Sequence, residues 1–155
     1  MAGLLGKPNA GTSSYSSTAG GYWPAAEFNV YRYYNKTMTG NRIATDPTQD
    51  LQGEVYAVVD SDRVRLLVGT RVPTGTWYIN LSSLSSISLP TSGTLNIHTY
   101  RFNGSSNHFQ EYDYPVDLRV YEHLYSSNQL PFPIYTTETY SALAFKFSRT
   151  SGATI

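Results

Sequence analysis

The residues best suited to chemistry gather in one stretch, residues 103–115 (NGSSNHFQEYDYP), which mixes aromatic rings with amide, imidazole and carboxylate groups. Aromatic faces stack on the apolar face of a pyranose ring, and planar polar groups bond its hydroxyls, so this mixture suits carbohydrate. The candidate binding residues are Tyr100, Arg101, Asn107, His108, Phe109, Glu111, Tyr112, Asp113, Tyr114, Tyr121 and His123. They predict a non-catalytic carbohydrate-binding site, with ordinary loop packing as the alternative for the same residues.

Two carboxylates in that stretch raise the question of catalysis. Glu111 and Asp113 are two residues apart, and glycoside hydrolysis uses two carboxyl groups. Nothing around them indicates the burial that raises the pKa of a general acid, and the chain has no Gly-x-Ser-x-Gly motif. We therefore assign no catalytic residue, and a small glycan-active hydrolase using this pair is the less favoured alternative.

Metal chemistry has little support. His98, His108 and His123 show no ligand spacing, and the chain contains no cysteine, so neither a zinc site nor any cofactor is predicted. Oxygen donors do occur in predicted loops, which leaves a structural calcium ion as a weak hypothesis without an EF-hand loop. These donors are Asp46, Asp50, Asp60 and Asp62.

Composition narrows the class of partner. Eleven basic and eleven acidic residues cancel, and no segment concentrates the positive charge that a nucleic-acid binder needs. No apolar run reaches the 18 or so residues of a membrane span. Fourteen tyrosines with only 14% charged residues are typical of an extracellular β-protein. Glycosylation sequons at Asn35, Asn80 and Asn103 favour secretion, although the first residues show no signal-peptide core.

The element that would position such a site is a set of strands. Between residues 53 and 81 three runs alternate apolar and polar residues, the first with Val55, Ala57 and Val59 on one face. Turn residues at 60–62 and 73–75 separate the runs. This stretch predicts a three-stranded antiparallel meander.

Further strands are predicted over residues 94–102, 116–125, 134–137 and 140–148, with a turn at 126–133 and a connection anchored by Leu84, Ile87 and Leu89. Seven to eight short antiparallel strands predict an all-β fold, a β-sandwich of jelly-roll or Greek-key type. The expected organisation is a flexible N-terminal segment (1–21), one sandwich domain (22–149) and a tail (150–155).

One short N-terminal α-helix is predicted over about residues 24–39. Pro24 suits a first turn, Phe28, Tyr31 and Met38 recur at helical spacing, and Gly40 suits the residue after the helix. The aromatic stripe of this helix is expected to pack on the sheet, or on a neighbour such as a second copy or a missing catalytic domain. A ligand-binding platform is the alternative for the same stripe.

Several phrases of the chain, in this order, resemble the C-terminal part of fungal proteins assigned to glycoside hydrolase family 39. They lie at residues 30–45 (VYRYYNKTMTGNRIAT), 55–81, 84–102 (LSSISLPTSGTLNIHTYRF) and 132–148 (FPIYTTETYSALAFKFS). The resemblance covers roughly residues 22–149 and contains no catalytic motif.

In that family a (β/α)8 barrel carries two catalytic glutamates, and a β-sandwich follows it. The barrel sequence is absent here, so no catalytic residue can be transferred. The resemblance implies an accessory sandwich that binds a glycan or polysaccharide without cleaving it. The alternative is a structural accessory domain with no ligand of its own.

Overall fold

Residues 53–70 form a hairpin within the larger sheet. Strand β4 (Gly53–Val59) pairs antiparallel with β5 (Arg63–Thr70), and Ala57 faces Leu66 in the register. At the turn Asp60 accepts a 2.8 Å hydrogen bond from the backbone N–H of Ser61, as expected of a turn aspartate. The computed structural model describes residues 5–6, 11–16, 23–24, 26–71, 74–104, 114–136 and 141–155.

Six strands form this larger sheet in the order β3-β4-β5-β10-β7-β8, and all neighbours are antiparallel. The remaining members are β3 (Asn41–Arg42), β7 (Gly93–Phe102), β8 (Val116–Tyr125) and β10 (Ala142–Ser148). Away from this sheet, β1 (Leu5–Gly6) pairs with β2 (Trp23–Pro24).

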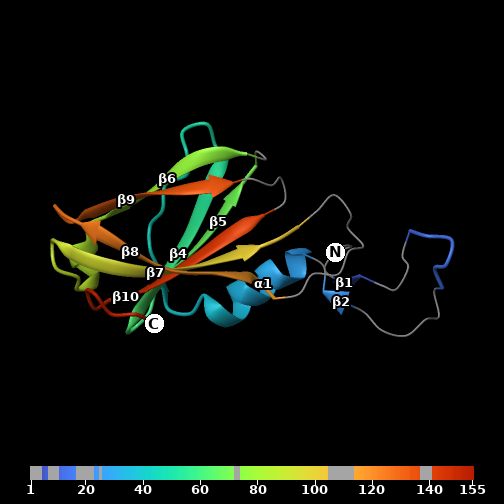
Figure 1. The fold of residues 1–155 in the computed structure, drawn as a ribbon, viewed down its shortest axis with the longest axis horizontal. Helices are drawn as coiled ribbons and strands as arrows, with labels where there is room; N and C mark the ends of the chain where they lie inside the picture. The colour runs from blue at the N-terminus through green and yellow to red at the C-terminus, as the bar shows by residue number, and fades with distance from the viewer. Residues whose placement is uncertain are drawn as a thin grey trace.

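The third strand of the predicted meander leaves the hairpin. β6 (Gly75–Ser82) pairs with β9 (Gln129–Thr136) in a separate two-stranded sheet, so the predicted three-stranded meander was wrong at this strand. Figure 1 shows β6 and β9 side by side, apart from the larger sheet. The alternation of β6 specifies which face is buried but not which strand it pairs with.

Strand β9 is longer than predicted. Residues 126–133 were assigned to a turn, yet Pro131 and Pro133 lie within the strand. Among the described residues β9 pairs only with β6, so a residue without an N–H group is tolerated where that N–H would point to the free edge. Burial alternates strictly along β9, with Leu130, Phe132 and Ile134 inside.

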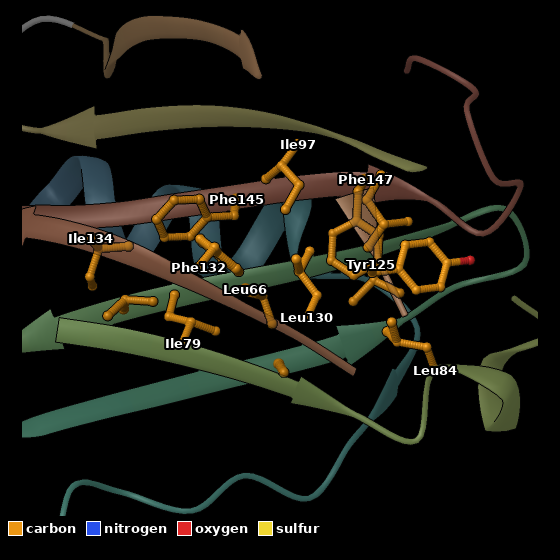
Figure 2. Close-up of a cluster of buried hydrophobic side chains, with 14 of the residues drawn as sticks. Leu66, Ile79, Leu84, Ile97, Tyr125, Leu130, Phe132, Ile134, Phe145 and Phe147 are labelled. Atoms are coloured by element: carbon orange, nitrogen blue, oxygen red, sulfur yellow. The ribbon is translucent and has the colours of Figure 1, made fainter. Parts of the chain in front are cut away.

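The hydrophobic core lies between the two sheets (Figure 2). Phe145 from β10 meets Phe132 from β9 edge to face, with ring centroids 5.4 Å apart. After β6, the 3-10 helix η1 (Leu84–Ile87) places Leu84 in the core, as predicted for that connection. The predicted all-β sandwich with one helix is confirmed. The most buried members are Ala57, Val64, Leu66, Leu84, Leu95, Ile97 and Phe147.

Helix α1 (Ala26–Thr37) covers the opposite face of the larger sheet (Figure 1). Tyr33 packs edge to face on Phe102 of β7, with ring centroids 5.3 Å apart, and Tyr34 lies 4.9 Å from Tyr56 of β4. Gly40 follows the helix at φ +105°, and a Cβ there would come within 2.3 Å of the carbonyl oxygen of Val59. Within the described residues, no helix is long and apolar enough to span a bilayer.

Candidate functional site

The sequence-predicted site residues divide between described and undescribed segments. Asn107, His108, Phe109, Glu111, Tyr112 and Asp113 lie outside the described residues. The structure places the other members on β7 and β8 and at the start of the segment that leads into β8. They are Tyr100, Arg101, Tyr114, Tyr121 and His123.

Tyr100 belongs to a polar network on the sheet face that also carries α1. Its ring stacks on His98 with centroids 4.3 Å apart, and its hydroxyl lies 3.2 Å from Nδ1 of that histidine. Nε2 of His98 lies 2.7 Å from a carboxylate oxygen of Asp117, to which it can only donate. Lys146 lies over the Tyr100 ring, with Nζ 5.6 Å from its centroid.

An irregularity between β7 and β8 brings Asp117 to this network. The register shifts between His98 and Tyr100, and Arg119 adopts φ +74° at that place, a conformation that non-glycine residues rarely take. The Asp117 carboxylate accepts the Arg119 backbone N–H at 2.7 Å. The hydrogen bond from Arg119 is the main cause that lowers the pKa of Asp117, and the bond from His98 is the second.

The other predicted residues do not join Tyr100. Tyr121 and His123 are paired with Ile97 and Leu95, so they project toward the core side of the sheet. The His123 ring lies 5.5 Å from Phe132, and burial lowers its pKa. Near the start of β8, the Tyr114 ring lies under the guanidinium of Arg32, 5.0 Å from ring centroid to Cζ.

Arg101 follows Tyr100 on β7 and is opposite Val116 of β8 and Leu143 of β10. Its Nε is buried and has no hydrogen-bond partner among the residues that the structure describes. Because residues next to each other on a strand point to opposite faces, the predicted set does not form one surface on the described strands.

A different aromatic surface lies on the two-stranded sheet. Tyr78 on β6 and Tyr135 on β9 are 71% and 66% exposed. Tyr78 is opposite Pro133, and Tyr135 is opposite Thr76, so the two tyrosines are diagonal neighbours on one face. Diagonal Cα atoms in such a pair are about 7–8 Å apart, within reach of aromatic side chains. We call this surface the ribbon face, made of Thr76, Tyr78, Asn80, Pro131, Pro133 and Tyr135.

The ribbon face carries no acidic or basic side chain. All six of its residues are exposed. Pro131 and Pro133 restrict the backbone beneath the tyrosines. This surface was not predicted from the sequence, because residues 126–133 were assigned to a turn. Strict alternation in QLPFPIYT was the signal that would have placed Pro133 and Tyr135 on one outer face.

Three of the four aspartates proposed for calcium are bonded to nearby side chains. Asp50 accepts from the Thr48 hydroxyl at 2.6 Å, Asp60 accepts from the Thr39 hydroxyl at 2.9 Å, and Asp62 pairs with Arg63. In the part of the chain that the structure describes, no group of three or more histidine, aspartate or glutamate residues is arranged to hold a metal ion. The calcium hypothesis stays a prediction.

Of the three sequons, Asn80 lies on the ribbon face and Asn35 on an exposed turn of α1. Asn103 is half-buried and directly follows β7.

The comparisons find neither a family model nor a curated protein that matches. Solved structures do match. N2152 from Neocallimastix frontalis has a TM-score of 0.66 at 16% identity, covering 82% of this chain and 31% of that one. A glucosidase from Croceicoccus marinus has a TM-score of 0.51 at 11% identity, covering 82% and 32%. A GH30 endoxylanase from Clostridium papyrosolvens C71 has a TM-score of 0.48 at 8% identity, covering 81% and 28%.

The first two matches show the fold: this sandwich also occurs within a glucosidase. The chain spans about a third of the length of these structures.

Proposed function

We propose that this chain is a non-catalytic carbohydrate-binding module of the accessory type found with glycoside hydrolases, and that the ribbon face binds its glycan. The observation that carries the proposal is the pair of exposed tyrosines, Tyr78 and Tyr135, on an uncharged two-stranded surface. The resemblance to the region after the barrel in fungal family 39 proteins supports the accessory role and an extracellular location. The fold shared with a glucosidase agrees with it.

The chemistry of the ribbon face indicates a neutral glycan. A tyrosine ring covers the apolar face of a pyranose, and Asn80 and Thr76 beside the rings can bond its hydroxyls. A surface without charge offers nothing to the carboxylates or sulfates of acidic polysaccharides. A neutral polysaccharide that lies flat across both rings is therefore the proposed ligand.

The sequence-predicted set remains a second candidate for glycan contact. It has a polar network at Tyr100 and an exposed ring at Tyr114. Tyr121 is also exposed but faces the other side of the sheet. A glycan bound there would depend on different side chains from one bound on the ribbon face, so substitutions separate the two candidates.

The test is affinity electrophoresis with neutral β-glucan, xylan and xyloglucan, and with polygalacturonate as the acidic control. Loss of one stacking tyrosine should cost about 1–2 kcal/mol, so Tyr78→Ala and Tyr135→Ala should each weaken binding to a neutral glycan by roughly 5- to 30-fold. Tyr78→Phe keeps the ring and should stay within about threefold. The matched control is Tyr31→Ala, which removes a 61% exposed tyrosine from α1 and should change nothing.

Other outcomes assign other functions. No retardation by any glycan would favour a structural accessory domain. Binding that survives Tyr78→Ala and Tyr135→Ala but disappears in Tyr114→Ala would move the site to the sequence-predicted set. Turnover of an aryl glycoside that is lost in Glu111→Gln would make the chain an enzyme.

A further inference from the structure

A groove runs along the open side of the sandwich, between β6 and the segment that follows β3. One wall is residues 43–48, the other is β6, and the cavity between them has a volume of about 470 Å³. The size is that of a ligand cleft. We call it the edge groove. Its floor is apolar and belongs to the core, with Val55, Ala57, Leu66, Val68, Ile79 and Ile134 lining it.

Within the described part of the chain, the β6 wall presents unpaired backbone groups to this groove. Pro131 and Pro133 of β9 are opposite Asn80 and Tyr78 of β6. A proline has no N–H, so these are the pairs in which the ladder makes no hydrogen bond, and the N–H and C=O groups of both partners point away from each other. The backbone groups of Tyr78 and Asn80 therefore point to the free edge of β6, and both residues line the groove although their side chains face solvent.

The opposite wall is held to β4 at its two ends only. The N–H of Ile43 donates to the carbonyl of Ala57 at 3.1 Å, and the N–H of Thr48 donates to the carbonyl of Gly53 at 3.0 Å. Val55 lies between these two positions, and within the described residues its backbone makes no bond to segment 44–47. The sandwich is thus open along this side, where the sheets could be bridged.

We propose that the edge groove receives an extended peptide segment with apolar side chains at alternate positions, which pairs with β6 as the third strand of its sheet. Backbone donors and acceptors along a strand edge are complementary to another strand. Alternate side chains of an added strand would point to the apolar floor and the others to solvent. The lining residues 77–82 correspond to roughly 20 Å of extended chain, or about six residues with three side chains facing inward.

The size of the β6–β9 sheet supports this occupant. Two strands alone are marginal, and an unpaired strand edge invites the addition of another strand. A glycan would match the hydrogen-bonding groups of the edge but not the Leu66 and Ile79 floor. A small apolar ligand would match the floor but leave the backbone groups of Tyr78 and Asn80 without partners.

The experiment measures binding of a set of decapeptides in which Thr alternates with Val, Ile or Leu, by calorimetry with the full chain. Asn80→Pro removes the edge N–H and places a ring where the peptide would pair, and it leaves the β9 ladder intact because its partner is Pro131. Asn80→Ala is the matched control, since it keeps the N–H. We expect wild type and Asn80→Ala to bind the peptide, and Asn80→Pro to bind it at least tenfold more weakly. Thermal unfolding of Asn80→Pro checks that this variant is folded.

A second measurement does not depend on the folding of a variant. Methylation of alternate backbone nitrogens of the best peptide keeps its side chains and removes its edge donors, and it should weaken binding at least tenfold. Hydrogen exchange at the amides of Tyr78 and Asn80 should slow when the unmodified peptide binds.

Several results would overturn the proposal. One is that no peptide of the set binds. Another is equal binding by the methylated peptide or by a peptide of the same composition with its apolar residues in one block, either of which would make the groove a site for apolar ligands. A concentration-dependent dimer that Asn80→Pro abolishes would make the occupant a second copy of this chain. None of these outcomes alters the glycan-binding test.

Discussion

The side chain of Arg149 links the residues around η1 to the β4–β5 turn, two segments that no strand ladder joins among the described residues, which makes it a sharp test of the structure. Nε donates to the carbonyl of Ile87 at 2.9 Å, and Nη1 donates to the carbonyls of Asp60 and Ser61 at 2.9 and 3.1 Å. Nη2 lies 3.2 Å from the hydroxyl of Ser88. One guanidinium thus connects the end of β10 to the β4–β5 turn and to the residues around η1.

The expected cost of Arg149→Met follows from these contacts. Methionine keeps the apolar stem and removes all five donors. The bonds to Ile87 and Asp60 are partly buried, whereas those to Ser61 and Ser88 are exposed and count for little. At about 1–1.5 kcal/mol for each partly buried bond, the free energy of unfolding should fall by about 2–3 kcal/mol. For a domain of this size the Tm should fall by about 4–12 °C.

The assay is urea unfolding followed by tryptophan fluorescence, with the midpoints compared at constant slope. Arg71→Met is the matched control. Its salt bridge to Glu54 is 3.0 Å long, but the two side chains are 67% and 65% exposed, so the change should stay within about 0.5 kcal/mol. The reasoning is refuted if Arg149→Met unfolds within that same margin of wild type, or if the two variants are equally destabilised.

Two further predictions concern pH. Burial raises the pKa of Tyr33 to about 12, although the nearby charge of Arg65 acts in the opposite direction. The tyrosine therefore ionises at a lower pH in the unfolded chain than in the folded one. The free energy of unfolding should fall as pH rises from about 10 to 12. Tyr33→Phe should flatten that fall in urea midpoints, and it should cost less than about 1 kcal/mol at pH 7, since the buried hydroxyl has no partner among the described residues. Hydrogen bonds, chiefly from the Ser61 N–H to Asp60 and from the Thr48 hydroxyl to Asp50, hold the pKa values of these carboxyls below 3.8. Their stabilisation is present above about pH 4 and should be lost as pH falls through the folded values, and Asp60→Asn should show a shallower decline of the midpoint between pH 6 and pH 2.5.

The buried faces of the strands and the position of the helix were predicted correctly, because residues near in sequence determine them. The face that each strand buries follows from a period of two, which is why Val64, Leu66 and Val68 were placed correctly in the core. The helix was predicted for the same kind of reason, from spacing and from Gly40 after its end. Its packing on the sheet through Tyr33 agrees with the expectation for its aromatic stripe.

Strand partners could not be predicted in the same way. β6 and β9 are far apart in sequence, and nothing in the alternation of either strand names the other. The prolines of β9 exclude a strand with two paired edges, not one with a free edge. Proline at alternate positions with apolar residues between them, as in residues 130–134, fits an edge strand.

The candidate site could not be predicted for the same reason, since it depends on which strands pair and in what register. Composition identified a region rich in rings and polar groups, but it could not tell that Tyr100 and Tyr121 lie on opposite faces of the β7–β8 pair. The irregularity after His98, which brings Asp117 beside the imidazole, has no signature in the residues that form it. Finding a shared surface requires the register, and the register is a property of the pair of strands.

The two proposed surfaces have a single structural origin in the departure of β6 from the hairpin. Had β6 paired with β5, its outer side chains would have joined the face of a broad sheet. Pairing with β9 instead exposes Tyr78 beside Pro133 and leaves the other edge of β6 without a partner strand among the residues that the structure describes. The same prolines determine both results: opposite Tyr78 and Asn80 they exclude ladder bonds, so the backbone groups of β6 at these positions point into the edge groove while the tyrosine ring faces solvent. A strand added at that edge would hydrogen-bond to the backbone beneath the tyrosine platform, so the two sites would share β6 without competing for the same side chains.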